Sequence, residues 1–248
     1  QGEKETTKAS KVLDLFRTNP NQHVKIETWN NMPTAAGLSS SSSGLSALVK
    51  AANELFQVGK TQSELAQIAK FASGSSSRSF FGPLAAWDKD SGEVYQVETD
   101  LKLAMIMLVL TDQKKPVSSR DGMKLCTETS TSFPEWIKQS EQDYKDMLGY
   151  LKANDFQAVG ELTEANALRM HQTTSTANPP FSYLTDASYQ AMDKVKALRA
   201  SGEQCYFTMD AGPNVKVLCL EEDLDRLAEH FRKDYQVIVS RTKELPDA

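Results

Sequence analysis

A run of glycine and serine residues between a predicted strand and a predicted helix most limits how this chain can fold. The segment Pro33–Gly44 reads PTAAGLSSSSSG. It follows the alternating apolar pattern of Val24–Trp29, which predicts a strand, and it leads into an apolar face with the period of a helix. That face consists of Leu45, Leu48, Ala52, Leu55 and Phe56. A strand followed by a loop and then a helix indicates an α/β architecture.

The same loop has the chemistry of a phosphate-binding site. Gly37 permits a close approach of the backbone to a ligand. At the start of a helix the unpaired N–H groups and the helix dipole favour negative charge, so the loop can surround a triphosphate while serine hydroxyls reach Mg²⁺ or phosphate oxygens. The alternative is that the serines only cap the helix and Gly37 only makes a turn. A cap needs a single serine, whereas several follow one another here, which favours ATP.

Two further segments combine serine with arginine. Ser73–Ser79 reads SGSSSRS and contains Arg78, whose guanidinium fits a carboxylate or phosphate through two hydrogen bonds. Ser118, Ser119 and Arg120 repeat this combination further along the chain. Each arginine alone is more typical of an ordinary solvated surface than of a binding site. Together, in an acidic protein, the two segments predict two anion sites.

An aspartate at the end of a predicted strand is the candidate acid–base group. Asp210 follows Cys205–Met209 and enters a Gly-Pro turn. Aspartate is common in turns for local reasons, so a turn-forming role is the alternative. A carboxylate at a strand end can also project rigidly into a cleft, and near Arg78 it would stay ionised, able to accept a proton or stabilise positive charge. This second role requires the loop of Arg78 and the turn of Asp210 to meet.

Composition argues against several other functions. Of the 248 residues, 40% are hydrophobic and 25% charged, enough for one large domain or two small ones. A net charge of −5 argues against a nucleic-acid or anionic-membrane surface. No apolar run approaches the ~20 residues of a membrane span, so we expect a soluble, cytoplasmic protein. The cysteines lack C-x-x-C spacing and predict buried free thiols, and the histidines lack the spacing of a transition-metal site.

The rest of the chain alternates between helix and strand patterns. Thr61 followed by Glu64 predicts a capping box, and Ser132 and Asp155 predict the starts of two further helices. The remaining predicted elements are helices at 9–17, 182–200 and 222–233 and strands at 94–97, 103–110, 204–209, 215–220 and 236–240. In chain order, the last five elements are 182–200, 204–209, 215–220, 222–233 and 236–240. Their order, αββαβ, indicates an antiparallel sheet with helices on one face.

Three motifs in this order are similar to those of one family, the diphosphomevalonate decarboxylases of the GHMP kinase superfamily. Pro33–Leu38 with its serines resembles the phosphate loop of the superfamily. Ser73–Ser79 resembles the Ser/Arg loop of the decarboxylases, and Met209–Val215 resembles their catalytic-aspartate segment. Ser119-Arg120 and Pro179–Leu184 add to a resemblance that covers nearly the whole chain.

The resemblance implies an α/β (α+β) GHMP kinase fold. Its N-terminal half would be ribosomal-protein-S5-like and its C-terminal half ferredoxin-like, with the active site in the cleft between them. We expect an ATP-binding domain at residues 1–115 and a second domain at 116–248. Two departures from the family pattern matter. Ser39 stands where the family usually has alanine, and the N-terminal Lys-Tyr-Trp-Gly stretch of the family is absent, so we expect the first domain to lack its first strands.

The resemblance also implies an enzyme and its ligands. The reaction would be the ATP-dependent decarboxylation of (R)-5-diphosphomevalonate to isopentenyl diphosphate, with release of ADP, phosphate and CO₂, in the mevalonate pathway of isoprenoid biosynthesis. Asp210 would orient or deprotonate the C3 hydroxyl, and Arg78 would be the second catalytic residue. The residues assigned to the substrate are Ser73, Ser75, Arg78, Ser119 and Arg120. Those assigned to ATP are Gly37, Leu38, Ser39, Ser40, Ser41 and Ser42, with Mg²⁺ at Ser41.

Two other functions remain compatible with these residues. A GHMP-type small-molecule kinase, such as a mevalonate or phosphomevalonate kinase, would use the same phosphate loop and aspartate but stop at the phosphorylated product. A regulator without catalytic activity would bind ATP or a metabolite on the same fold. Neither alternative requires nucleic acid or a membrane, and relatives of this family are commonly homodimers, so we expect a homodimer.

Overall fold

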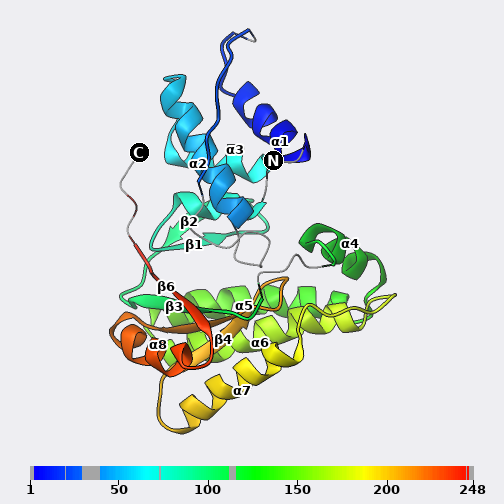
Figure 1. The fold of residues 1–248 in the computed structure, drawn as a ribbon, viewed down its shortest axis with the longest axis vertical. Helices are drawn as coiled ribbons and strands as arrows, with labels where there is room; N and C mark the ends of the chain where they lie inside the picture. Colours follow the sequence, from blue (N-terminus) through cyan, green and yellow to red (C-terminus); the bar gives the residue numbers. More distant parts are fainter. Residues whose placement is uncertain are drawn as a thin grey trace. The chain divides into compact units, whose positions relative to one another are not determined.

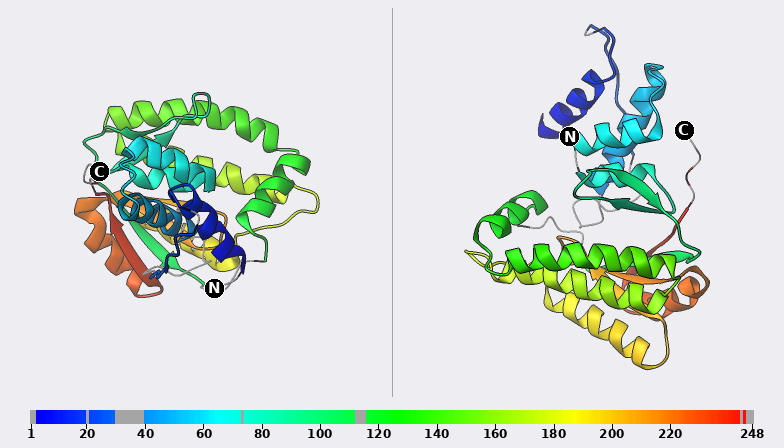
Figure 2. Two further views of the ribbon diagram at one scale, coloured as in Figure 1. Left: turned by 90° about the horizontal axis from the view of Figure 1, so that it is seen from above. Right: turned by 180° about the vertical axis from the view of Figure 1, so that it is seen from behind.

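The computed structural model describes residues 3–19, 21–29, 40–72, 74–111, 116–243 and 245, and all structural statements below concern these residues. Contacts divide the chain into two compact units, which can be followed along the ribbon in Figure 1 and Figure 2. The first unit holds most of residues 1–97 and the C-terminal segment from Lys243, and the second holds Glu98–Thr242.

The first unit combines helices with a small sheet. Its elements are α1 (Glu3–Asp14), α2 (Ser40–Leu55), α3 (Gln62–Ala72), the 3-10 helix η1 (Gly74–Phe80), β1 (Leu84–Trp87) and β2 (Val94–Val97). β1 and β2 pair antiparallel, with Leu84 opposite Val97. The helices pack around buried apolar side chains that include Val12, Phe16, Val49, Leu65, Ala69 and Phe80.

The two helices after the glycine–serine loop confirm their predictions. α2 begins at Ser40, so the serine run forms its first turn. Leu55 is 59% exposed because it is the last helical residue, and Phe56 packs against the core instead. Before α3 the predicted capping box is present: the Thr61 N–H donates to Glu64 Oε2 at 2.8 Å, and the Glu64 N–H donates to Thr61 Oγ1 at 3.3 Å.

The strand predicted at Val24–Trp29 is wrong. This segment forms neither helix nor strand, and Ile26 and Trp29 expose 41% and 87% of their surfaces. A strand is stable only when it is hydrogen-bonded to neighbouring strands, and no strand in the described part of the chain pairs with this segment. Alternating apolar residues alone do not form a strand when no neighbouring strand is available for hydrogen bonding.

The second unit combines an antiparallel sheet with longer helices. Its helices are α4 (Ser119–Thr129), α5 (Phe133–Lys152), α6 (Phe156–Ser175), α7 (Asp186–Ala200), the 3-10 helix η2 (Glu221–Asp223) and α8 (Leu224–Arg232). Its strands are β3 (Leu103–Val109), β4 (Cys205–Met209), β5 (Val215–Leu220) and β6 (Gln236–Arg241), in the sheet order β4-β5-β3-β6. The antiparallel sheet and the αββαβ order expected for this part are confirmed.

Strand β3 explains why the division between the units differs from the boundary we expected at residue 115. Ile106 in β3 lies opposite Val217 on one side and Val239 on the other. Both neighbours of β3 thus come from the C-terminal part of the chain. β3 therefore belongs to the second unit, and the division falls after Val97.

The helices of the second unit cover the sheet in two ways. Ile106, Phe207 and Val217 are fully buried in one cluster with side chains from α7 and α8, so these two helices share a face of the sheet, as predicted. Helix α6 lies along the edge strand β4, where Glu164 Oε1 accepts a hydrogen bond from the Phe207 N–H at 3.0 Å. This contact satisfies a backbone donor that an edge strand would otherwise expose.

Two helix starts differ in detail from their predictions. Ser132 precedes α5 but makes no capping hydrogen bond, and its Oγ lies 2.7 Å from Thr176 Oγ1. α7 begins at Asp186 rather than Ser182, because Thr185 forms a capping box with the following turn. Ser132 thus contacts Thr176 instead of capping α5, and Thr185 rather than Ser182 caps α7.

The cysteines have the state that their spacing predicts. Cys126, Cys205 and Cys219 are free and buried, as predicted. Burial raises the pKa of Cys205 to about 11 and that of Cys219 to about 12, so both thiols stay protonated and unreactive near neutral pH. None of the helices that the structure describes is both long and apolar enough to cross a lipid bilayer.

Candidate active site

Asp210 is the first residue after β4, in the turn that joins β4 to β5. Its carbonyl accepts a hydrogen bond from the Gly212 N–H at 2.7 Å. Its side chain is 53% exposed, so the carboxylate is accessible from solvent while the backbone is part of a hairpin. The predicted position at a strand end is confirmed.

The turn that carries Asp210 is fixed to two other elements. Asn214 is 2% exposed, and its Oδ1 accepts hydrogen bonds from the N–H groups of Leu110 at 2.7 Å and Thr111 at 3.1 Å. On the other side, Ser188 Oγ in α7 donates to the Pro213 carbonyl at 2.6 Å. The backbone beside Asp210 is therefore held to the end of β3 and to α7, which limits its motion.

A buried lysine contacts the carboxylate of Asp210. Lys216 Nζ forms an ion pair and a hydrogen bond with Asp210 Oδ2. The Lys216 side chain is only 11% exposed. Local sequence patterns do not identify this residue, because the contact depends on the hairpin register, in which Lys216 lies opposite Thr208. A lysine inside an otherwise apolar strand was the available signal.

A buried histidine lies beside the same segment. His171 in α6 is 6% exposed, and both of its ring nitrogens are buried next to the backbone of Met209 and Asp210. Burial lowers the pKa of His171, while the backbone and charge of Asp210 and the backbone of Met209 act in the opposite direction. His171 lies within α6, which continues to Ser175.

In the first unit, serine hydroxyls gather where α2 begins. Ser42 Oγ lies 2.5 Å from Ser75 Oγ in η1, which brings a predicted ATP residue next to a predicted substrate residue. Ser46 Oγ donates to the carbonyls of Ser42 at 2.8 Å and Ser76 at 2.9 Å. The segment predicted as a Ser/Arg loop is thus largely a 3-10 helix docked on the start of α2.

The predicted arginines occupy exposed positions. Arg78 lies in the last turn of η1 in the first unit, with an exposed side chain. Ser119 and Arg120 are the first two residues of α4 in the second unit, and both are exposed. Ser118 is the N-cap of α4, and its Oγ accepts from the Asp121 N–H at 3.1 Å. The Ser/Arg pair of α4 therefore lies at a helix N-terminus, which favours anions.

Part of the predicted site lies outside the described residues. Gly37, Leu38, Ser39 and Ser73 are in this group. Ser40 and Ser41 are helical, at the start of α2, but their side chains are not among those described. The proposed Mg²⁺ contact of Ser41 consequently stays a prediction.

The serine cluster offers hydroxyl groups, which are of the kind that can bind Mg²⁺ or phosphate oxygens. Ser76 Oγ is fully buried and makes no hydrogen bond with a described residue, so this cluster holds an unused polar group. The described residues contain no group of three or more His, Cys, Asp or Glu side chains that could hold a metal. Mg²⁺ often takes few protein ligands and binds through substrate phosphates, so hydroxyls and phosphate oxygens suit it.

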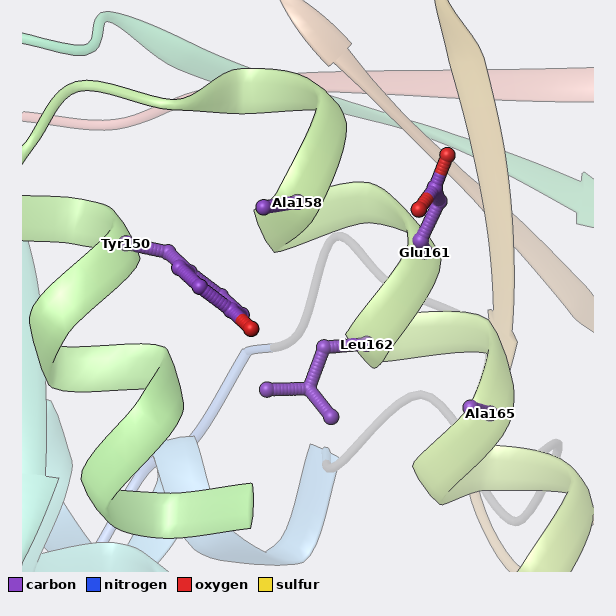
Figure 3. Close-up of a pocket in the computed structure, with 5 residues that line it drawn as sticks. All are labelled: Tyr150, Ala158, Glu161, Leu162 and Ala165. Carbon is purple, nitrogen blue, oxygen red and sulfur yellow. The ribbon is translucent and has the colours of Figure 1, made fainter.

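A shallow depression of about 260 Å³ lies elsewhere in the second unit, between α5 and α6 (Figure 3). It is lined by Tyr150, Ala158, Glu161, Leu162 and Ala165. None of the predicted site residues lines it. It therefore does not mark the candidate site.

Two family models match this chain. Residues 1–97 match the model of the diphosphomevalonate decarboxylase-like N-terminal domain, and residues 105–246 match that of the mevalonate 5-diphosphate decarboxylase C-terminal domain. The diphosphomevalonate decarboxylases of Candida albicans and Saccharomyces cerevisiae are 32% and 33% identical over 83% and 80% of this chain. The chain spans 60% and 53% of the lengths of these two relatives.

Solved structures show the same fold. The mevalonate pyrophosphate decarboxylase of Streptococcus pyogenes is 68% identical, with a TM-score of 0.95, over 100% of this chain and 78% of that one. A protein named MDDEF, solved in complex with MVAPP, AMPPCP and magnesium, is 38% identical, with a TM-score of 0.83, over 99% of this chain and 80% of that one. The fold is accordingly the mixed α/β fold of the GHMP kinases. Within that class, the chain belongs to the diphosphomevalonate decarboxylase family.

Proposed function

We propose that the protein containing this chain is an ATP-dependent diphosphomevalonate decarboxylase, which converts (R)-5-diphosphomevalonate to isopentenyl diphosphate in the mevalonate pathway. The observation that carries the proposal is the half-exposed carboxylate of Asp210 on a turn that Asn214 and Ser188 hold in place. A fixed carboxylate open to solvent suits a group that must orient one hydroxyl of a bound substrate. The related protein solved with MVAPP, AMPPCP and magnesium supports the same ligands, ATP and Mg²⁺.

The chemistry requires loss of a poor leaving group from a tertiary carbon. ATP supplies a phosphoryl group, which becomes bonded to the C3 oxygen as the bond to ADP breaks, and the hydroxyl proton passes through Asp210 to solvent. The C3–O bond then breaks with release of phosphate, the bond to the carboxylate carbon breaks with release of CO₂, and its electron pair forms the double bond. Asp210 accepts the hydrogen bond of the C3 hydroxyl before transfer and faces positive charge at C3 afterwards.

The remaining residues are proposed to hold charged groups of the ligands. Arg78 and Ser75 bind the substrate carboxylate through hydrogen bonds that a guanidinium and a hydroxyl can donate. Ser73, Ser119 and Arg120 bind carboxylate or diphosphate oxygens. Residues 37–42 bind the ATP phosphates at the start of α2, with Ser41 on Mg²⁺. The proposal requires that Arg78 and Asp210 reach one substrate molecule.

We also propose that the protein acts in the cytoplasm as a homodimer. The family resemblance supports the dimer, because members of this family are commonly homodimers. Light scattering coupled to size-exclusion chromatography of the full-length protein tests the dimer, and a monomer mass would contradict it.

A coupled assay of the full-length protein tests the reaction itself. ATP, Mg²⁺ and 5-diphosphomevalonate are added, and ADP and CO₂ are followed together. Equimolar ADP and CO₂ is the expected result. ADP without CO₂ would identify the small-molecule kinase, and ligand binding without either product would identify the regulator.

The variant Asp210→Asn tests the role of the aspartate. It keeps the shape of the side chain but removes its charge, so we expect folded protein with retained ATP binding and a kcat lower by about 10²- to 10⁴-fold. The exposed residue Asp90 provides the control Asp90→Asn, which should leave kcat unchanged. Near-normal turnover of Asp210→Asn would exclude the assignment.

A further inference from the structure

Lys216 is an unusual residue for its position in the sheet. β3, β4 and β5, which the structure describes in full, contain no other charged side chain. In the antiparallel register Lys216 lies between Thr208 of β4 and Met107 of β3, on the face opposite the main core. The side chain is 11% exposed, so most of the ammonium-bearing chain is removed from water.

A buried ammonium needs an anionic partner, because desolvation of an isolated charge is costly. Among the described residues, the acidic partner of Lys216 is Asp210. The contact joins Nζ to one oxygen of the carboxylate, Oδ2. No described residue hydrogen-bonds to the other oxygen, Oδ1, although the side chain is 53% exposed. The two oxygens of Asp210 therefore differ: Oδ2 is bound by Lys216, and Oδ1 is available to another group.

The backbone around this pair is fixed as well. Asn214 and Ser188 hold the turn from two sides, so rotation of the Asp210 side chain is the main remaining freedom. The hydrogen bond from Lys216 removes that freedom, because rotating the carboxylate would leave the buried ammonium without its partner.

We propose that Lys216 is a positioning residue that fixes the Asp210 carboxylate with Oδ1 directed at the substrate hydroxyl. The inference rests on the proposed function, since it assigns a role within the same reaction. Lys216 does not touch the substrate in this scheme. Its effect on the reaction is transmitted through Asp210, so it acts on the chemical step rather than on the binding of ATP.

The variant Lys216→Met tests this role, because methionine is an unbranched apolar side chain of similar length that can fill the same space. We expect kcat to fall by about 10- to 100-fold, since misplacement of a catalytic group by about 1 Å costs up to that much. KM for ATP should stay within about twofold. Lys216→Arg, which keeps the positive charge, should recover part of the lost kcat.

A second ion pair in the same unit provides the matched control. Lys194 of α7 contacts Asp234 and donates to the His230 carbonyl at 2.7 Å, with a side chain that is 25% exposed. Lys194→Met removes a comparable partly buried pair without touching Asp210. It should lower Tm but leave kcat unchanged. A kcat of Lys216→Met equal to that of the wild type, or to that of Lys194→Met, would overturn the positioning role.

A measurement of stability separates this inference from the proposed function. Asp210→Asn leaves the Lys216 ammonium buried without a carboxylate and should lower Tm by about 2–4 °C. Adding Lys216→Met to Asp210→Asn should restore part of that loss. If the wild type releases no CO₂ but this coupling is present, the proposed function fails and the ion pair stands. If the wild type is active and the Tm changes simply add, the pairing of the two residues is refuted.

Discussion

His171 makes the stability of the second unit sensitive to acid. The imidazole is buried beside the ring of Tyr183 and the segment Met209–Asp210. Burial is the largest influence and lowers its pKa below the ordinary value of 6.5. The folded protein therefore binds fewer protons than the unfolded chain just below pH 6.5, so the free energy of unfolding falls as the pH drops through this region.

The variant His171→Phe tests this effect. It keeps an aromatic ring in the buried position but cannot be protonated. We expect the wild type to lose more stability than the variant between about pH 7.5 and about pH 5, by at most about 1.4 kcal/mol per pH unit. Urea unfolding at each pH measures the difference. His23→Phe, at an exposed position, is the control and should match the wild type. Equal pH slopes for wild type and His171→Phe would assign the acid sensitivity to other groups.

At the residue scale, the sequence identified side chains with a local pattern and missed those defined by contacts. Asp210 was found because it ends a strand and enters a Gly-Pro turn. Lys216 and His171 were not given a role beside it, since their contacts to Asp210 arise from the hairpin register and from the packing of α6. Nothing in the spacing of these residues along the chain predicts either contact.

At the element scale, the packing of α6 against β4 depends on the absence of a side chain at Gly160. A Cβ atom at this position would lie 2.0 Å from Tyr206 Cδ2, which is far inside any permitted contact. Gly160→Ala should therefore force the helix or the ring to move and lower the free energy of unfolding by about 1–3 kcal/mol. Urea unfolding measures this change.

Gly149 in α5 is the matched control for that substitution. A Cβ atom there would meet no atom within 4 Å. Gly149→Ala should accordingly raise the free energy of unfolding by about 0.5–1 kcal/mol, because alanine loses less backbone freedom in a helix than glycine. Equal effects of the two substitutions would show that the close approach of α6 to Tyr206 is not what stabilises this packing.

The predicted elements differ in accuracy for a physical reason. The start of α3 was found because Thr61 and Glu64 are close in sequence and bond to each other. The strand at Val24–Trp29 was wrong because a strand needs a partner that local sequence does not specify. β1 (Leu84–Trp87) was missed, although its partner β2 was predicted, since four residues without strict alternation carry little signal.

On the scale of the whole molecule, each unit has its own apolar core. Every buried residue in the cluster around Ile106, Phe207 and Phe231 lies within Glu98–Thr242. We therefore expect a fragment of residues 98–242 to fold alone, with a helical circular dichroism spectrum and cooperative thermal unfolding. A gradual loss of signal without a transition would show that the second unit depends on the first.

The division between the units shows what the sequence could not provide. The pattern of Leu103–Val109 correctly predicted a buried strand. Its position in the chain, before the helical part, suggested membership in the first domain. Only the pairing of β3 with β5 and β6 assigns it to the second unit, and that pairing joins residues far apart in sequence.

The central place of β3 has a consequence for how the protein is made. Helices α4 to α7 all separate β3 from the strands beside it. During translation, the apolar segment Leu103–Val109 leaves the ribosome long before either neighbour has been synthesised. The four-stranded sheet cannot be completed until the β6 residues have emerged from the ribosome. A stalled or prematurely terminated chain would therefore expose an unpaired apolar strand that is prone to aggregation. Chaperones that shield such segments would act on this chain from the emergence of β3 until β6 has been synthesised.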